Sequence, residues 1–422
     1  MRERMSSKQD DRKRRVLIIV ENLPVPFDRR VWAEATTLTR AGYDVSVICP
    51  KGHGCQRSAE IIEGVHIYRH SLPAETRGIL SYFIEYPTAL FFQLALSMRV
   101  ALTRGFDVIH ACNPPDLSFL IGLFYKLSAR KRFLFDHHDA NPELYEAKFK
   151  RRDWLWRLLV FLEKCTFRAA DVTIAPNESY REIAMKRGGL PPDRIFVVRS
   201  GPEIARFKQC QPDPRWRSGR RFLAAYVGVI GESEGLDLLI ESVAHIVSTR
   251  KRNDLQFVVV GSGPQWQTIV TMCENADLRQ FVTFLGRVDD DTLFSVLCTS
   301  DICVNPDRVT AMNDISTMNK IMEYMVFGKP IVQFEVTEGR FSAQAASLYA
   351  RPNDPIDFGD KILELIDDPA RRDVMGQFGF TRVREQLAWD FEAPKLLAAY
   401  DALFEHARSG SPADPRGDMR TQ

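Results

Sequence analysis

The sequence predicts an α/β protein made of two doubly wound units, each built on a mainly parallel sheet. Short continuous apolar runs of strand length recur along the chain, and segments with helical periodicity separate most of them. The run at 16–20 precedes a helical segment and a second run at 44–50, which is the order of a strand–helix–parallel strand unit. Beyond residue 221 a second series of the same kind begins, so the same architecture occurs twice.

The first unit is expected to span residues 15–205. A helix between its first two strands would end at Gly42, because glycine readily takes the left-handed conformation that closes a helix. Residues 1–14 are basic and are expected to be disordered, and the apolar run after them is too short for a signal peptide. Strands are expected at 16–20, 44–50, 65–70, 107–111, 133–137, 172–175 and 195–198.

The second unit is expected to span residues 206–388 and to begin with a polar, proline-containing linker at 208–221. Residues 389–407 are expected to form a final packed helix. Residues 408–422 are polar and rich in Gly and Pro, which predicts a disordered tail. Strands are expected at 222–228, 255–260, 281–285, 302–304 and 331–334.

Composition excludes several classes of protein. The 422 residues carry a net charge of only +2, which gives no indication of a nucleic-acid partner. Eight cysteines form no CxxC pair, a pattern typical of reduced thiols rather than of a zinc site or a disulfide framework. The most hydrophobic window, 79–101, is interrupted by Glu85, Pro87, Gln93 and Arg99, so no membrane-spanning helix is expected. We therefore expect a cytoplasmic protein.

The segment 313–339, NDISTMNKIMEYMVFGKPIVQFEVTEG, is the most informative stretch and reads as a loop, a short helix and a buried strand. Ser316 is expected to cap the helix. Lys320 and Glu323 share one face of it at helical spacing. A helix N-terminus can hold phosphate, and a carboxylate further along can accept both hydroxyls of a ribose. The segment outlines a nucleotide site, although an amphipathic helix with a solvated Lys–Glu pair fits it equally well.

From residue 16 to about residue 406 the chain resembles the retaining glycosyltransferases of family four, which have the GT-B fold. The resemblance implies two Rossmann-like domains facing across a cleft, with the last helix crossing back to the N-terminal domain. It implies that the C-terminal domain binds a nucleotide-diphosphate sugar and that the N-terminal domain mostly binds the acceptor. The passages that carry it are VLIIVENLPVPFDRRVWAEATTLTRAGYDVSVICP, FDVIHACNPPD, FDHHDANPELY, FRAADVTIAPNESYREI, DRIFVVRSGPE, GLDLLIESV, VVVGSGP, VTFLGRV and IMEYMVFGKPIV.

The implied function is metal-independent, hexosyltransferase-like transfer of a sugar, with retention, to a glycan or lipid-linked acceptor. The N-terminal passages most resemble members that build exopolysaccharide or lipopolysaccharide. No DxD pair follows a predicted strand, and no cofactor beyond the nucleotide-sugar co-substrate is expected.

The resemblance assigns roles to individual residues. Glu323 matches the glutamate that holds the ribose, and His138 the histidine beside the donor sugar. With Lys320 these form the expected catalytic set. Weaker candidates for the acceptor or the diphosphate are Arg29, Arg30 and Asp139. The expected donor-binding residues are Gly228, Gly231, Ser262, Gly263, Arg287, Asp314, Ser316, Thr317 and Asn319.

Three positions depart from the family pattern. Val229 and Glu234 replace an Arg and a Lys that commonly hold the diphosphate, and Ile315 replaces the first glutamate of a two-glutamate motif. These replacements favour an alternative reading, a GT-B homologue that has lost transfer and acts as a partner or scaffold in polysaccharide assembly. A nucleotide-sugar epimerase of the same fold is a third reading.

One basic and aromatic segment, KFKRRDWLWRLLVFLEK, predicts either of two surfaces. Its cations and Trp154 and Trp156 could sit on anionic lipid, which would place the protein at the inner face of the plasma membrane. A cationic surface helix with its tryptophans in the core accounts for the same residues.

Overall fold

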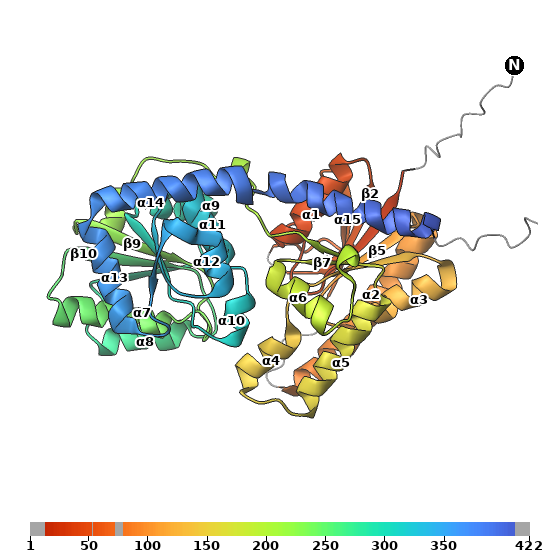
Figure 1. The fold of residues 1–422 in the computed structure, drawn as a ribbon, viewed down its shortest axis with the longest axis horizontal. Coiled ribbons are helices and arrows are strands. Elements are labelled where there is room, and N and C mark those ends of the chain that lie inside the picture. The colour runs from red at the N-terminus through yellow and green to blue at the C-terminus, as the bar shows by residue number, and fades with distance from the viewer. Residues whose placement is uncertain (1–12, 53, 72–78, 410–422) are drawn as a thin grey trace, which may run out of the picture. The chain divides into compact units, whose positions relative to one another are not determined.

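The structure is a computed structural model, and it describes residues 13–52, 54–71 and 79–409. They form two compact units (Figure 1). The first comprises Met1–Glu146, Arg151–Val198 and Ala393–Gln422, and the second Ala147–Lys150 and Arg199–Glu392. The predicted disordered termini, 1–14 and 408–422, lie almost wholly outside the described residues.

The first unit is built on an eight-stranded sheet with the order β3-β4-β2-β1-β5-β6-β7-β8. All neighbours pair in parallel except β3, which pairs antiparallel with β4 at the edge. The inner strands are buried because their runs are apolar on both faces. The bounds are β1 Arg15–Ile19, β2 Asp44–Pro50, β3 Ala59–Ile62, β4 Val65–His70, β5 Val108–Cys112, β6 Arg132–Asp136, β7 Val172–Ala175 and β8 Ile195–Val197.

Helices of the first unit connect these strands, and the C-terminal helix returns to it. Tyr400 on that helix lies edge-on to Tyr43, with ring centroids 5.5 Å apart, and its hydroxyl is 2.9 Å from His110 Nδ1. The predicted return of the last helix to the first unit is therefore confirmed. The bounds are α1 Arg29–Arg40, α2 Ile79–Thr103, α3 Phe119–Ala129, α4 Asn141–Phe149, α5 Trp154–Ala169, α6 Glu178–Lys186 and α15 Trp389–Ser409.

The second unit is built on a six-stranded parallel sheet with the order β11-β10-β9-β12-β13-β14. This is the strand order of dinucleotide-binding domains, in which the chain reverses direction across the sheet between β9 and β12. The strands are β9 Phe222–Val227, β10 Leu255–Val260, β11 Val282–Gly286, β12 Ile302–Asn305, β13 Ile331–Phe334 and β14 Ser347–Ala350. The helices are α7 Leu236–Ala244, α8 Trp266–Asn275, α9 Asp290–Thr299, α10 Ala311–Ile315, α11 Asn319–Val326, α12 Thr337–Ala343, α13 Pro355–Asp367 and α14 Pro369–Arg382.

Short irregular helices complete both units. They are the 3₁₀ turns Pro192–Arg194, Ile204–Arg206, Pro214–Arg217 and Gln344–Ala346 and the π turns His245–Thr249 and Val383–Leu387.

The core of the second unit covers both faces of its sheet. Along β9, Phe222, Ala224 and Tyr226 belong to one apolar cluster, whereas Leu223 and Ala225 belong to the other. Successive side chains of a strand point to opposite faces, so this alternation is what a sheet covered by helices on both sides requires. The predicted α/β class, with two Rossmann-like units, is confirmed.

The structure differs from the sequence-based expectation in three places. β3 and β14 were not expected. The units divide between Val198 and Arg199 rather than at 205/206. The passage expected to be a linker instead packs on the second unit, where Arg217 Nη1 lies 2.6 Å from Asp301 Oδ2 and Trp216 Nε1 donates to Ser295 Oγ at 2.9 Å.

Within the described residues, none of the helices combines the length and the apolar character needed to cross a membrane.

Candidate functional site

Lys320 lies at the point where the second sheet reverses direction. Its ammonium Nζ is 2.7 Å from Asp307 Oδ1, after β12, and 3.5 Å from the hydroxyl of Tyr226, on β9. Asp307 is only 2% exposed, so Lys320 is held by a buried carboxylate. Because parallel sheets bind ligands beyond the carboxyl ends of their strands at such a point, Lys320 marks the candidate site of this unit.

A glycine-containing turn follows β9 beside Lys320. The Tyr226 hydroxyl donates to the Val229 carbonyl oxygen at 2.7 Å, and Val229 itself is 55% exposed. Gly228 has φ +156°, and a Cβ there would lie 2.8 Å from the Tyr226 hydroxyl and 3.5 Å from Lys320 Nζ. Only glycine therefore permits the backbone to lie this close to the Tyr226 hydroxyl, which itself contacts Lys320.

The loop after β10 packs against the same turn. Ile230 N donates to Ser262 O at 3.2 Å, and a Cβ on Gly263 would lie 2.5 Å from Ile230 O. The structure thus brings the predicted residues Gly228, Ser262 and Gly263 together.

Gly231, another predicted donor-binding residue, lies beside the side chain of Glu234 in the same turn. Oε2 of Glu234 lies 2.5 Å from the place that a Cβ on Gly231 would occupy. Burial raises the pKa of Glu234, and Lys320 opposes the rise while Asp307 adds to it. A half-buried carboxylate therefore lies beside Gly231 at the candidate site.

The residues before α11 differ from the expectation. Ser316 does not cap α11: it ends α10, and its hydroxyl donates to Met312 O at 2.8 Å. Met318 is the N-cap of α11 and makes no side-chain cap bond. The cap was misplaced because Thr310 starts a helix inside the expected loop, accepting from Asn313 N. Asn319 is exposed at the first position of α11, and Thr317 and Glu323 are half-buried.

Two other predicted donor residues lie in α10 and after β11. Asp314 accepts from the N–H and the hydroxyl of Thr337, at 2.8 and 3.0 Å, and so fixes the start of α12. It also borders a cavity of about 480 Å³ whose walls include Arg340 and Phe341. Arg287 is exposed after β11, the edge strand two positions from β9.

In the first unit, Arg30 forms the centre of a buried ionic network. Its guanidinium donates to both oxygens of Asp136, at 2.8 and 3.2 Å, and lies 3.2 Å from Glu34 Oε1. His138 Nε2 is 2.6 Å from Asp136 Oδ2. Asp136 ends β6 and Arg30 begins α1, so the fold joins groups 106 residues apart in the sequence.

The two carboxyl groups of this network respond to it in opposite ways. Burial raises the pKa of Glu34 well above its usual range, and the neighbouring Asp136 raises it further. Burial alone would raise the pKa of Asp136, but Arg30 and His138 hold it well below its usual range. The network therefore favours the protonated form of Glu34 and the charged form of Asp136.

The turn after β6 places His138. Asn113 Oδ1 accepts from the N–H groups of His138 and Asp139, at 2.7 and 3.1 Å, and Asn113 Nδ2 donates to Asp139 O at 2.6 Å. Burial raises the pKa of Asp139. Arg29, in contrast to Arg30, is exposed at the first position of α1.

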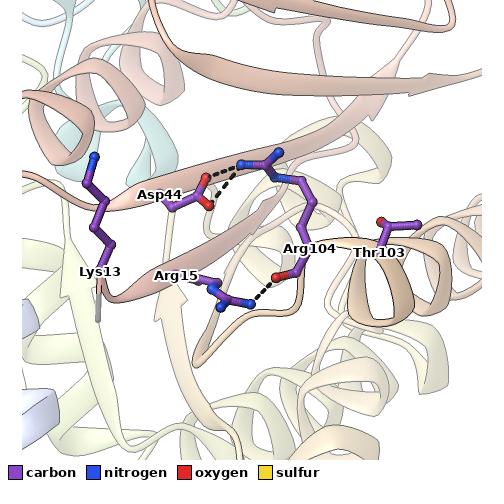
Figure 2. A pocket seen from close by; sticks show the side chains of 5 residues that line it. All are labelled: Lys13, Arg15, Asp44, Thr103 and Arg104. Carbon is purple, nitrogen blue, oxygen red and sulfur yellow. Dashed lines mark hydrogen bonds and ion pairs between the residues drawn. The ribbon is translucent and has the colours of Figure 1, made fainter. Parts of the chain in front are cut away.

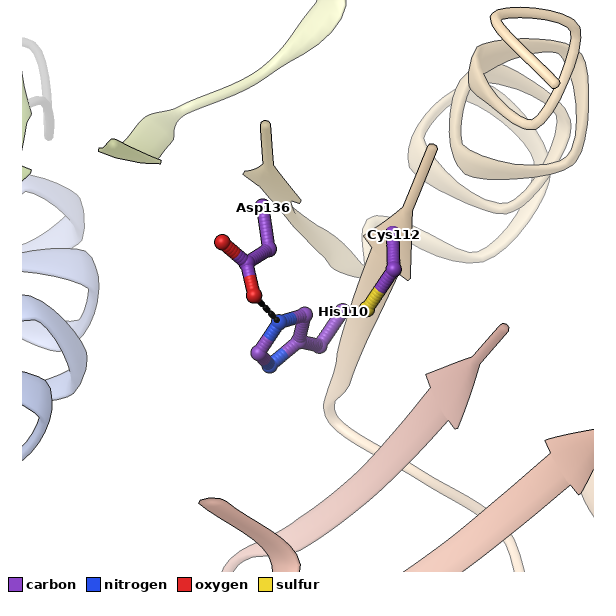
Figure 3. Close-up of side chains that lie close together, drawn as sticks. All are labelled: His110, Cys112 and Asp136. Atoms are coloured by element: carbon purple, nitrogen blue, oxygen red, sulfur yellow. Dashed lines mark ion pairs between the residues drawn. The ribbon is translucent and has the colours of Figure 1, made fainter. Parts of the chain in front are cut away.

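Two overlapping sets of side chains here have the chemistry of metal ligands, namely His110, Cys112 and Asp136, and Glu34, Asp136 and His138. Figure 3 shows the first set, with the His110 ring facing Asp136. The atoms of each set lie within 4.8 Å of one another. The Arg30 guanidinium already neutralises these carboxyl groups, and burial raises the pKa of the Cys112 thiol. The donor set therefore fits an ion-pair network better than a cation site.

A basic cavity of about 420 Å³ lies at the amino ends of strands in the first sheet, opposite to the ends that Asp136 and His138 follow (Figure 2). It is bordered by Arg15 and Asp44, which begin β1 and β2, and by Arg104, whose Nη2 donates to both oxygens of Asp44 at 2.7 and 2.8 Å. Because it lies at the amino ends of the strands, it is not where this topology places a ligand.

Sequence reasoning missed Asp307, Tyr226 and Glu34 as members of these clusters, whereas Asp136 belongs to the FDHHD passage, which the sequence already places at the end of a strand. Position could also have indicated Asp307, since it follows β12 at the carboxyl end of the sheet. Glu34 could have been noticed as an ionisable residue one turn after Arg30 on a helix face that is otherwise apolar.

An exposed apolar face lies on α5 and its neighbour α3. Trp154 is 65% exposed, so the expectation that both tryptophans lie in the core is wrong for this one. Leu158 and Phe161 follow it at helical spacing, and Phe124 and Leu127 are exposed on α3. Arg151, Arg152 and Arg157 are exposed beside this face.

Each unit matches a family of known proteins over most of its length. Residues 28–206 match the family described as Glycosyltransferase Family 4, and residues 221–368 match the family described as Glycosyl transferases group 1. Among solved structures, the sucrose-phosphate synthase of Thermosynechococcus elongatus has a TM-score of 0.77 and 19% identity, covering 93% of this chain and 100% of that one. HepE from Anabaena, in complex with UDP and glucose, has a TM-score of 0.68 and 14% identity, covering 94% and 100%. These likenesses show the GT-B fold.

Curated relatives are more similar in sequence over shorter stretches. The phosphatidylinositol N-acetylglucosaminyltransferase GPI3 subunit of Saccharomyces cerevisiae is 24% identical over 54% of this chain and 49% of its own length. The chain thus spans about half the length of this relative. The phosphatidyl-myo-inositol mannosyltransferase of Propionibacterium freudenreichii is 25% identical over 70% of this chain and 69% of its own.

Proposed function

Because the chain joins a glycosyltransferase family 4 domain to a glycosyl transferases group 1 domain in a GT-B fold, we propose that it transfers a sugar with retention. The donor is a nucleotide-diphosphate sugar, and the acceptor is a glycan or lipid-linked molecule of cell-surface polysaccharide synthesis. One observation carries the proposal. Lys320 is anchored by buried Asp307 at the point where the second sheet reverses direction, with Glu323 one turn further along α11.

In this proposal the second unit binds the donor. Glu323 accepts from the ribose hydroxyls, and Lys320 stabilises the charge that develops on the departing diphosphate. The backbone of Gly228 and Gly231 approaches the phosphates. These groups supply the positive charge in place of a metal ion. Ser262, Gly263, Arg287, Asp314, Ser316, Thr317 and Asn319 make up the rest of the proposed donor site.

The first unit contributes His138 and the acceptor site. Asp136 holds the imidazole at 2.6 Å, and the Asn113 bonds fix its backbone, so His138 is preorganised for one orientation. We assign His138 to the donor sugar, as the resemblance implies, and Arg29, Arg30 and Asp139 to the surroundings of the acceptor or diphosphate.

A lipid-linked acceptor accords with two observations. Both curated relatives described above carry phosphatidylinositol in their names. The exposed face around Trp154 and Phe161 combines apolar side chains with arginines, which suits an anionic lipid surface. We propose that this face brings the protein to the inner face of the plasma membrane as a peripheral protein.

The experiment is calorimetric binding of UDP, GDP, TDP and ADP in the presence of EDTA, followed by hydrolysis of the matching sugar donor. We expect micromolar binding of one nucleotide and slow hydrolysis of its sugar. HepE was solved with UDP, so UDP is the first to test. Binding that requires added Mg²⁺ would contradict the metal-independent part of the proposal.

A second candidate is a partner or scaffold protein without transferase activity. Exposed Val229 and acidic Glu234 favour it, because they stand where the family commonly has two cations. Failure of all four nucleotides to bind would support it.

A further inference from the structure

We infer that Asp116 is a positioning residue of the transfer reaction: its buried carboxylate holds the side chain of Asn113, which in turn holds the turn that carries His138. Asp116 lies between β5 and α3. The inference rests on the proposed function, in which His138 contacts the donor sugar, and Asp116 acts on the sugar only through this chain of hydrogen bonds.

The side-chain amide of Asn113 uses all of its hydrogen-bonding groups. Nδ2 donates to Asp116 Oδ1 at 2.9 Å and to Asp139 O at 2.6 Å. Oδ1 accepts from the N–H groups of His138 and Asp139, at 2.7 and 3.1 Å. A primary amide has two donor hydrogens and two acceptor lone pairs, so each is satisfied here. Because Asn113 is only 1% exposed, a lost partner would leave a buried polar group unsatisfied.

The carboxylate of Asp116 joins two segments that follow neighbouring strands. Oδ1 accepts from Asn113, after β5, and Oδ2 accepts at 2.8 Å from Nδ2 of Asn141, which begins α4 after the turn at the end of β6. Asp116 is 3% exposed, and its carbonyl oxygen accepts at 3.1 Å from the Thr166 hydroxyl of α5. The carboxylate is therefore fixed from its own backbone, and it acts on the segment 138–141 from both sides.

Removal of the acceptor oxygens of Asp116 should move the turn rather than the whole unit. Without them one buried N–H of Asn113 lacks a partner, so the amide is expected to rotate and to withdraw Oδ1 from the backbone of His138. The imidazole keeps its partner Asp136, 2.6 Å away, but loses the fixed backbone behind it. A displacement of about 1 Å in a reacting group can slow a reaction by about 100-fold.

Three variants of Asp116 separate hydrogen bonding from packing. Asp116→Leu keeps the branched shape without acceptors, and Asp116→Ala removes the acceptors together with the branch. Asp116→Asn keeps one acceptor for Asn113, and its own N–H can donate to Asn141 once that amide turns over. The matched control is Asp171→Leu, because Asp171 accepts from the N–H of Phe133 at 2.9 Å at the other end of the same sheet.

The first measurement needs no substrate. The sequence has eight histidines, so protein labelled with ¹⁵N-histidine gives few amide signals, and His138→Gln identifies that of His138. We expect the His138 amide to exchange with solvent at least about tenfold faster in Asp116→Leu and Asp116→Ala than in wild type. Asp116→Asn and Asp171→Leu should exchange as wild type, because both leave Asn113 with an acceptor.

The second measurement compares kcat with nucleotide affinity. Burial raises the pKa of Asp116 to about 6, so hydrolysis of UDP-glucose and GDP-mannose and binding of UDP and GDP are measured at about pH 8, where the carboxylate is charged. We expect kcat to fall at least about tenfold in Asp116→Leu and Asp116→Ala. Nucleotide affinity should stay within about twofold of wild type, because the nucleotide is assigned to the second unit. Asp116→Asn should retain most of kcat.

The outcomes that would overturn the inference differ from failure of the proposed function. Wild-type kcat in Asp116→Leu or Asp116→Ala would overturn the inference and leave the proposed function standing. Equal losses of kcat in Asp171→Leu and Asp116→Leu would also overturn it, because Asp116 would then only support the fold. If wild type hydrolyses neither donor, the proposed function is contradicted, and exchange of the His138 amide decides alone whether Asp116 holds the turn: faster exchange supports this, and unchanged exchange overturns it. If Asp116→Leu does not fold, Asp116→Ala serves for both measurements.

Discussion

Both units have charged groups at the carboxyl ends of their parallel strands, but these groups have different kinds of partner. In the first unit, Arg30, Asp136 and His138 bind one another within 3.2 Å, and Asp136 is fully buried. In the second, Lys320 is paired with one buried carboxylate, Asp307, and Glu234 beside it is only half-buried.

We therefore expect the two charged clusters to have different functions, although both lie at the carboxyl ends of parallel strands. A closed network of buried ion pairs fixes geometry, because every charge has a partner and breaking one pair is costly. A lysine that is paired with a single carboxylate, at the point where the sheet reverses direction, can also bind a ligand anion. The first cluster is thus expected to position His138, and the second to bind the donor.

The largest expected effect is on the stability of the first unit. Asp136→Ala leaves the Arg30 guanidinium buried without its main partner, which costs about 3–5 kcal/mol of unfolding free energy. Urea unfolding measures it, with the exposed Glu182→Gln as a control that should stay within about 0.5 kcal/mol. Adding Arg30→Met should recover part of the loss. A change below about 1 kcal/mol in Asp136→Ala would show that the network does not hold the fold.

Next in size is the effect of Glu323→Ala on nucleotide affinity. Loss of hydrogen bonds from the ribose to a carboxylate, each worth about 1.5–3 kcal/mol, should weaken binding by at least about tenfold. Calorimetry measures the affinity, and unfolding should change little because Glu323 is only half-buried. Glu364→Ala on α13 is the matched control. Unchanged affinity in Glu323→Ala would mean that the ribose lies elsewhere.

A third prediction concerns pH and Glu34. Its folded pKa is raised, so its contribution to stability is complete below the unfolded pKa and is lost as pH rises through the folded value. Glu34→Gln mimics the protonated side chain and should remove this loss, up to about 1.4 kcal/mol per pH unit. Urea unfolding from pH 4 to 9, in steps of about one unit, gives the slope of the unfolding free energy against pH for wild type and for Glu34→Gln. If the free energies of unfolding of wild type and Glu34→Gln changed with pH at the same rate, the raised pKa of Glu34 would be contradicted.

The smallest expected effect is at the apolar face of α5. Trp154→Ser and Phe161→Ser should each weaken binding to vesicles with anionic lipid by roughly three- to tenfold, because each buries apolar area in the interface. Val374→Ser, an exposed residue of the second unit, is the control. Sedimentation with vesicles measures binding, and equal binding of all three variants would remove the proposed lipid contact.

Much of the fold was predictable because buried parallel strands are continuous apolar runs. The edge strand β3 escaped notice because alternate residues, such as Ala59 and Ile61, are exposed, and no apolar run marks it. Likewise α10 has only five residues and begins at a threonine cap inside a polar segment. Local patterns of this length do not distinguish a loop from a helical turn.

The candidate site was predictable in part. Lys320 and Glu323 share a helix, so spacing alone puts them together. The partners of the ionic groups lie outside their own helices: Asp136 is 106 residues from Arg30, and Asp307 is 13 residues from Lys320, after strand β12. Such pairings depend on strand order, and the turn of Glu234 onto Gly231 depends on side-chain rotamers. The sequence therefore indicates candidate residues at strand ends but not which of them pair.

The most direct measurement of the account is amide hydrogen exchange of the full chain, with and without saturating UDP or GDP, whichever binds. We predict slower exchange in residues 228–235 and 319–326, while residues 29–40 and 132–138 exchange as before, because their network is complete without ligand. Protection confined to 29–40 and 132–138, with none in the turn after β9 or in α11, would contradict the assignment of the donor site to the second unit.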